Sequence, residues 1–206
     1  MMVGLGATGL ISRIMFARET SDMDILVSLD CHVEAGKLFV RYALTNNGRL
    51  PLLTYDGAPG KPPDAEWPDL KGQLYVSVLG DKVSLKRIDA PPPPGVLVNR
   101  RFIPPLSQTL PGEQREVRFV LEEPVTERSE FTPDFAGATY VEQTVHYVEL
   151  QLGCFWRTQA MELIPFPANP KAFRLKGTHG AQSFLTTQKQ CAVRVKQRTD
   201  PAFRRI

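Results

Sequence analysis

The stretch that decides the fold is "DILVSLDCHVEAGKLFVRYALTNNGRLPLLTYD", residues 24–56. In 24–34, apolar side chains alternate with mainly polar ones, and a repeat of two predicts a half-buried β-strand. Residues 37–45 repeat this pattern, and only Ala35-Gly36 separates the two segments, so they predict a β-hairpin. The inward positions of the second strand are Leu38, Val40, Tyr42 and Leu44.

After this hairpin, Asn46-Asn47-Gly48 predicts a bend, because Asn and Gly adopt positive φ at low cost. A strand is expected to resume in "PLLTYD", 51–56. Further strands are predicted from the same alternation, in "QLYVSVL" (73–79), "KVSLKRI" (82–88), "EVRFVL" (116–121), "ATYVEQTVHYVELQLGCFW" (138–156), "RTQAMELIPF" (157–166) and "KQCAVRVKQR" (189–198). We expect 157–166 to be the hairpin partner of 138–156.

The composition supports an all-β protein. The chain has 206 residues, of which 18 are proline, and proline disfavours long helices because it has no N–H to donate. About eight strand candidates at short intervals, without a convincing helical repeat between them, are typical of a sandwich. We therefore predict an antiparallel, immunoglobulin-like β-sandwich with long Pro/Gly-rich loops, with a barrel as the alternative.

The predicted organisation has three parts. Residues 1–22 are expected to form an irregular N-terminal extension, 23–200 the β-sandwich, and 201–206 a basic tail. Regular patterning starts at Met23, which is an alternative start of translation. The first residues are a poor secretory signal, and this slightly favours a cytoplasmic location. No apolar run reaches the length that a membrane span needs.

Two segments carry a family resemblance. "GKLFVRYALTNNGRLPLLTYD" (36–56) and "LPGEQREVRFVL" (110–121) resemble strands of bacterial immunoglobulin-like domains, and are similar to the bacterial intracellular proteinase inhibitor family. The resemblance covers about a quarter of the chain and implies the fold. No inhibitory residue of that family can be matched here.

Charge is concentrated at the C-terminal end. From Thr186 to Ile206 there are six basic residues and one acid, although the whole chain has a net charge of only +3. Arg194, Lys196 and Arg198 share the predicted outer face of 189–198. Binding of nucleic acid or an anionic surface is therefore one alternative function. Exposed aromatic residues for base stacking are scarce in this segment.

"GLGATG", residues 4–9, formally matches the dinucleotide-binding fingerprint. Such a site needs a buried strand before the glycine turn and a helix after it. Only Met1 to Val3 precede Gly4, and 24–34 alternates like an antiparallel strand. We therefore predict no bound cofactor.

The histidines offer one route to catalysis. An enzyme site assembled around Asp30, His32 or His146 is a second alternative function. His32 falls on the polar face of its strand, and His146 shares the parity of Val148 and Leu150, which predicts a buried side chain. No two histidines have the spacing of a zinc pair, so no metal site is predicted.

The three cysteines, Cys31, Cys154 and Cys191, fall on apolar faces of their strands, which favours buried side chains over nucleophiles. Cys31 and Cys191 would face each other if the first and last strands were neighbours. The sequence leaves open whether they form a disulfide.

The predicted contact surface lies in two loops, 57–72 and 90–105. They contain Trp67, Arg100, Arg101 and Phe102, and both tryptophan and arginine are enriched at interface hot spots. A loop tryptophan that only covers the end of the sandwich is the structural alternative. The sequence thus favours a non-catalytic protein-binding or assembly module, with partner and oligomeric state undetermined.

Overall fold

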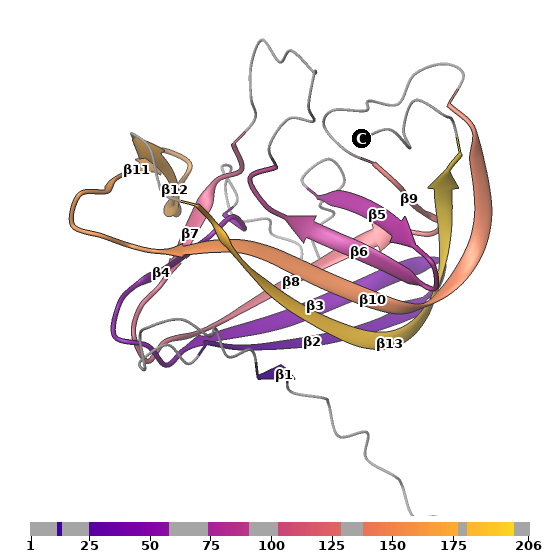
Figure 1. The fold of residues 1–206 in the computed structure, drawn as a ribbon, viewed down its shortest axis with the longest axis horizontal. Coiled ribbons are helices and arrows are strands. Elements are labelled where there is room, and N and C mark those ends of the chain that lie inside the picture. Colours follow the sequence, from indigo (N-terminus) through magenta and orange to yellow (C-terminus); the bar gives the residue numbers. More distant parts are fainter. Residues whose placement is uncertain are drawn as a thin grey trace, which may run out of the picture.

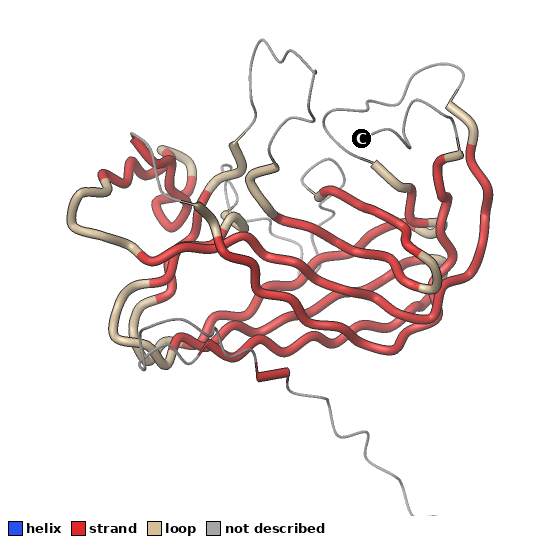
Figure 2. Tube along the Cα trace, viewed as in Figure 1, coloured by secondary structure: helices blue, strands red, loops and turns tan. Residues whose placement is uncertain are grey.

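The structure is a computed structural model that describes residues 12–13, 25–57, 74–90, 103–128, 138–176 and 181–199. Every regular element within these residues is a β-strand (Figure 2), which confirms the predicted all-β class. No helix in the described part of the chain has the length and apolarity to cross a membrane.

The strands form two sheets. The smaller one, called sheet A, has four strands in the order β1 (Ser12–Arg13), β2 (Ile25–Glu34), β3 (Lys37–Asn46) and β8 (Gln114–Glu122). All neighbours in it are antiparallel. β1 belongs to the segment 1–22 and pairs with β2 at Leu26 and Val27. The rest of that segment and residues 200–206 lie outside the described residues.

The larger sheet, called sheet B, is branched. One edge of its long strand β10 (Tyr140–Trp156) pairs with β13 (Ser183–Arg198). The other edge is shared by β6 (Lys82–Arg87) and β4 (Leu52–Thr54). The remaining strands extend these branches: β5 (Tyr75–Leu79), β7 (Leu106–Thr109), β9 (Val125–Thr126), β11 (Glu162–Phe166) and β12 (Asn169–Lys176).

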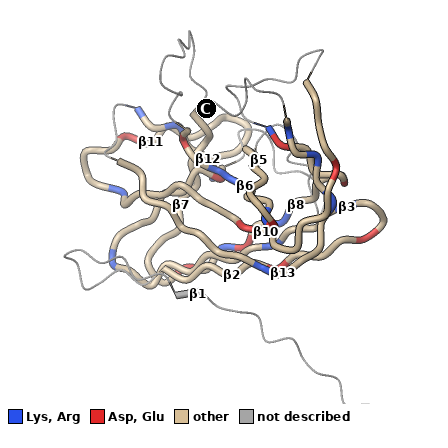
Figure 3. Tube along the Cα trace, turned by 45° about the vertical axis from the view of Figure 1, so that its right-hand side comes forward, with Lys and Arg blue, Asp and Glu red and all other residues tan. Residues whose placement is uncertain are grey.

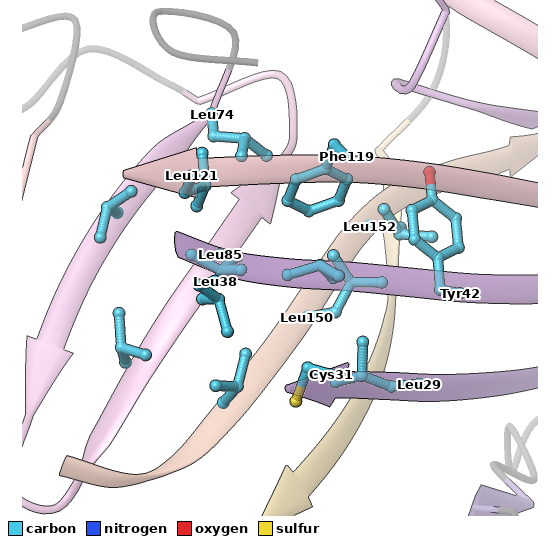
Figure 4. Packing of buried hydrophobic residues seen from close by; sticks show 14 of the residues in the cluster. Leu29, Cys31, Leu38, Tyr42, Leu74, Leu85, Phe119, Leu121, Leu150 and Leu152 are labelled. Carbon is cyan, nitrogen blue, oxygen red and sulfur yellow. The ribbon is translucent and has the colours of Figure 1, made fainter. Parts of the chain in front are cut away.

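Sheets A and B enclose one apolar core (Figures 1 and 4). Sheet A contributes side chains of β2, β3 and β8, and sheet B contributes those of β6, β10 and β13. Burial of this apolar surface is the main favourable term that holds the sheets together, at about 25 cal/mol for each Å² removed from water. The residues at its centre include Leu38, Val40, Phe119, Val83, Leu85, Val148, Leu150 and Val195.

The predicted first hairpin is confirmed. β2 and β3 pair in register from Ile25–Asn46 to Glu34–Lys37. Ala35 and Gly36 have φ of 48° and 72°, the positive values that a two-residue turn requires. The four predicted inward side chains of β3 are at most 1% exposed.

The bend after β3 carries the chain from sheet A to sheet B, because β4 belongs to sheet B. Asn46 is the last residue of β3, and its buried side chain holds the bend. Its Nδ2 donates to the carbonyl oxygens of Leu50 and Thr109, each at 2.9 Å. Its Oδ1 accepts from the N–H of Gly48 at 3.0 Å. The opening motif is therefore a structural bend between the two sheets.

The pairing within sheet B differs from the prediction in two ways. It is mixed and not wholly antiparallel, because β6–β10 and β9–β13 are parallel pairs. The predicted hairpin between 138–156 and 157–166 is also wrong, since β11 pairs with β12. Alternation identifies a strand but not its partner. β10 forms a much longer ladder of backbone hydrogen bonds with β13 than a hairpin with the short β11 could provide.

A second, smaller apolar cluster lies on the β4–β7–β12 branch of sheet B. Its buried members are Leu53, Tyr55, Leu106 and Phe155. The rings of Tyr55 and Phe155 are tilted at 58°, with centroids 5.7 Å apart. Strands β7 and β12 were not predicted, because each has polar or charged residues at positions where alternation requires apolar ones.

Candidate functional site

The residues that flank the two predicted contact loops are tied to one another. Gly57, which precedes the segment 58–73, donates its N–H to the carbonyl oxygen of Pro105 at 3.0 Å. Pro105 follows the segment 91–102. Arg87 donates from Nη2 to the carbonyl oxygen of Gly57 at 3.3 Å. The start of one loop and the end of the other thus share a hydrogen-bonded base.

The start of the second loop is also held. Asp89 donates its N–H to Oε1 of Gln182 at 3.2 Å, and Nε2 of Gln182 donates back to the Asp89 carbonyl oxygen. Gln182 immediately precedes β13, so this amide joins the loop to the last strand of the fold. We call Gly57, Arg87, Asp89, Pro105 and Gln182 the loop base.

Beneath the loop base lies a buried carboxylate, Asp56, whose side chain is 0% exposed. Its Oδ1 accepts hydrogen bonds from the hydroxyls of Thr54, at 2.7 Å, and of Ser107. Its Oδ2 accepts from Tyr42 Oη at 2.5 Å and from Arg115 Nη2 at 2.7 Å. Each carboxylate oxygen therefore has two donors, and the four lone-pair positions are occupied by the protein. We call these five residues the Asp56 cluster.

The electrostatics of the cluster follow from burial and from two cations. Burial alone would raise the pKa of Asp56, but the guanidinium groups of Arg115 and Arg87 and the hydroxyl donors lower it far below its usual value. Burial and the nearby Asp56 charge raise the pKa of Tyr42, so this phenol stays protonated and donates. A carboxylate that stays ionised at neutral pH and has every acceptor position filled is suited to holding strands in place, not to proton transfer.

The cluster joins both sheets. Tyr42 is on β3 and Arg115 on β8 of sheet A, whereas Thr54 and Ser107 are on β4 and β7 of sheet B. In sheet A, Arg115 lies opposite Leu44 across the β3–β8 ladder. Arg115 Nη2 also donates to the Thr54 hydroxyl at 2.9 Å. Because these hydrogen bonds are buried, removing one member leaves its partners with an unfilled donor or acceptor away from water.

Sequence reasoning missed this cluster, although a signal was present. Arg115 has the same parity as the inward side chains of Val117 and Phe119. Arg87 likewise shares the parity of Val83 and Leu85. A cation on the apolar face of a strand needs a buried anion, because unpaired buried charge is costly. What alternation could not supply is the identity of that anion.

Gly57 lies where the backbone of β7 comes very close. A Cβ added at Gly57 would stand 2.5 Å from the carbonyl oxygen of Leu106, a distance that real Cβ contacts do not reach. The obstacle is backbone, which cannot rotate away as a side chain can. The loop base thus requires glycine here.

The Nε donor of Arg87 is unusual. It is 4% exposed, and its Nε has no hydrogen-bond partner in the described part of the protein. Buried polar groups nearly always have a partner, so this donor is out of the ordinary.

The residues of the predicted enzyme site lie in separate places. Asp30 and His32 are on β2, where Asp30 lies 3.9 Å from Lys189 Nζ. His32 stacks on Phe39, with ring centroids 5.0 Å apart, and its side chain is 55% exposed, as predicted. His146 is in the other sheet, where its Nδ1 lies 2.7 Å from Asp81 Oδ1.

The prediction that His146 is buried is wrong, because its side chain is 58% exposed. The β10–β13 register shifts between Val145 and Tyr147, so that His146 alone stands opposite two residues of β13, Cys191 and Ala192. Val145 and Val148 both face the core, and His146 is turned outward. Its N–H donates to Asp81, which fixes the bulge against the β5–β6 turn. A bulge resets the parity that the prediction relied on.

The basic strand face is largely matched by acids. Arg194 lies 3.9 Å from Glu123, and Lys196 lies 3.3 Å from Glu142. Arg198 is only 2% exposed, so its predicted outward position is wrong. Figure 3 shows positive and negative residues interspersed along the described strands.

The predicted contact residues Trp67, Arg100, Arg101 and Phe102 lie outside the described residues. The two segments that contain these residues are flanked by residues of the loop base. Within the described ranges, no group of three or more His, Cys, Asp or Glu side chains is arranged to hold a metal ion.

The prediction of buried cysteines is confirmed for two of the three. Cys154 is 2% exposed, and burial raises its pKa to about 12. Cys31 is 8% exposed, whereas Cys191 is only partly buried at the margin of the core. All three are free thiols.

Comparison with known proteins supplies no relative: no protein-family model, no curated protein and no solved structure matches the chain.

Proposed function

We propose that the chain is a non-catalytic protein-binding or assembly module on an immunoglobulin-like β-sandwich. The loops 57–72 and 90–105 make the contact, with Trp67, Arg100, Arg101 and Phe102 as the anchoring side chains. A single observation carries this proposal: the start of the first loop and the end of the second share one base, in which Gly57 is bonded to Pro105 and to Arg87. Loops that bind partners are typically held in this way by a rigid scaffold.

The Asp56 cluster supports the same function, because it stiffens the scaffold at that end. It joins β3 and β8 to β4 and β7 directly beneath Gly57. Pre-organised loops lose less conformational entropy on binding, so a rigid base raises affinity without adding any contact. Two sheets that face each other over one core support the sandwich part of the proposal.

Affinity capture with the full chain tests the proposal. Extracts of the source cells are passed over the wild type, Trp67→Ala and the double variant Arg100→Ala/Arg101→Ala, and retained proteins are identified by mass spectrometry. The matched control is Lys37→Ala/Lys176→Ala, which removes two exposed cations that are not part of the loop base.

We expect a partner that the wild type and control retain and that both loop variants lose by at least tenfold. That factor corresponds to about 1.4 kcal/mol, within the range of a hot-spot residue. Partners that bind all four proteins equally would contradict the choice of surface. Captured nucleic acid with steep salt dependence would favour the basic C-terminal segment instead.

A further inference from the structure

Cys31 and Cys191 come together where the two sheets meet at one side of the core. Cys31 is on β2 of sheet A, and its side chain lies on the same side of that strand as Leu29 (Figure 4). Cys191 is on β13 of sheet B and packs against the same core. The two strands are in different sheets, yet several of their Cα pairs lie within 8 Å.

Contacts on both sides of Cys191 join β13 to strands of sheet A. Lys189 Nζ, two residues before Cys191, lies 3.9 Å from Asp30 Oδ1, which adjoins Cys31. On the other side, Glu123 accepts a hydrogen bond from the N–H of Arg194 at 2.8 Å and so ties β13 to the end of β8. Between these contacts, the thiols of Cys31 and Cys191 lie close enough for each to shift the pKa of the other.

We propose that Cys31 and Cys191 form a reversible intrachain disulfide, which joins sheet A to sheet B, when the protein meets a two-electron oxidant such as hydrogen peroxide. β2 and β13 already bring the two residues together from different sheets, and closing the bond requires their Cα atoms to lie about 4.4–6.8 Å apart. Cys154 takes no part, because it is buried within sheet B and has no thiol neighbour among the described residues.

The chemistry assigns different roles to the two thiols. Cys191 is the more exposed, and the neighbouring Cys31 thiol lowers its pKa, which favours the thiolate as nucleophile. Its sulfur attacks one peroxide oxygen, the O–O bond breaks, and Cys191 becomes a sulfenic acid as hydroxide leaves. Cys31 then attacks the sulfenic sulfur, the S–O bond breaks, and the thiol proton leaves with the oxygen as water. Two thiols and one peroxide thus give one disulfide and two waters.

The test uses the purified full chain, first reduced and then treated with hydrogen peroxide. Free thiols are counted after denaturation, and non-reducing peptide mapping by mass spectrometry locates any crosslink. We expect the thiol count to fall from the three cysteines of the sequence to one, with peptides containing Cys31 and Cys191 joined and reduction restoring three. A bond that closes so long a loop raises the melting temperature by about 4–16 °C.

Three variants sharpen the result. Cys154→Ala keeps the pair and is expected to lose both remaining thiols on oxidation, whereas Cys31→Ala and Cys191→Ala are expected to form no intrachain crosslink. Three thiols remaining in the oxidised wild type would overturn the proposal. A crosslink that includes Cys154, or one that joins two chains, would overturn it as well. The peptide map of the wild type decides the matter even if a variant fails to fold.

Discussion

Replacing Asp56 by Asn tests the central claim that a buried carboxylate joins the two sheets. The substitution keeps the shape of the side chain but removes the charge opposite Arg115, whose side chain is only 19% exposed. Breaking a buried, hydrogen-bonded ion pair by removing one partner costs about 3–5 kcal/mol, because the other charge stays buried without compensation. For a chain of this size, that loss lowers the melting temperature by roughly 6–20 °C.

The assay is urea unfolding followed by intrinsic fluorescence and by circular dichroism, with the free energy of unfolding taken from the midpoint and slope. The matched control is Asp30→Asn, in which a carboxylate that is 68% exposed loses an ion pair of 3.9 Å. An exposed pair contributes less than about 1 kcal/mol, so this control is expected to unfold almost like the wild type.

A double-mutant cycle with Arg115→Met separates the pair from its surroundings. We expect the double variant to lose about 1–3 kcal/mol less than the sum of the two single variants, because neither charge is then left alone. A loss for Asp56→Asn no greater than that of Asp30→Asn would refute the reasoning. Strict additivity in the cycle would show that Asp56 and Arg115 do not stabilise each other.

Three further outcomes follow from the structure. The folded-state pKa of Asp56 lies below its ordinary value of 3.8, so its contribution to the free energy of unfolding is complete above that pH and is lost as the pH falls. Below pH 4, the difference in free energy of unfolding between wild type and Asp56→Asn should therefore shrink by up to about 1.4 kcal/mol per pH unit. A difference that stays constant in acid would contradict this. Gly57→Ala should destabilise by about 1–3 kcal/mol in urea unfolding, because its Cβ meets the Leu106 carbonyl oxygen; wild-type stability would argue against the tight loop base. His146→Ala should change the free energy of unfolding by less than about 1 kcal/mol, whereas Val145→Ala should cost about 2 kcal/mol or more, because the bulge buries Val145 and exposes His146; the reverse order would place the bulge elsewhere.

Part of the candidate site could have been predicted from the sequence. The parity of Tyr42 places its ring in the core, and a buried phenol needs a hydrogen-bond partner. Arg115 and Arg87 fall on the inward faces of their strands in the alternation, which predicts buried cations. Asp56, however, follows a three-residue strand whose side chains are all buried, so no alternation marked it as the missing anion. The thiol pair was foreseen only on the condition that β2 and β13 are neighbours.

The sequence by itself determined most of the longer strands and the faces of most of them, because a side-chain repeat of two is a local property that each segment carries alone. It therefore predicted β2, β3, β5, β6, β8 and β10, together with the turn at Ala35-Gly36. Only the tertiary structure decided which strands pair, since pairing depends on ladders between segments far apart in the chain. The parallel β6–β10 pair, the bulge that exposes His146 and the meeting of four strands around Asp56 all arise at that level.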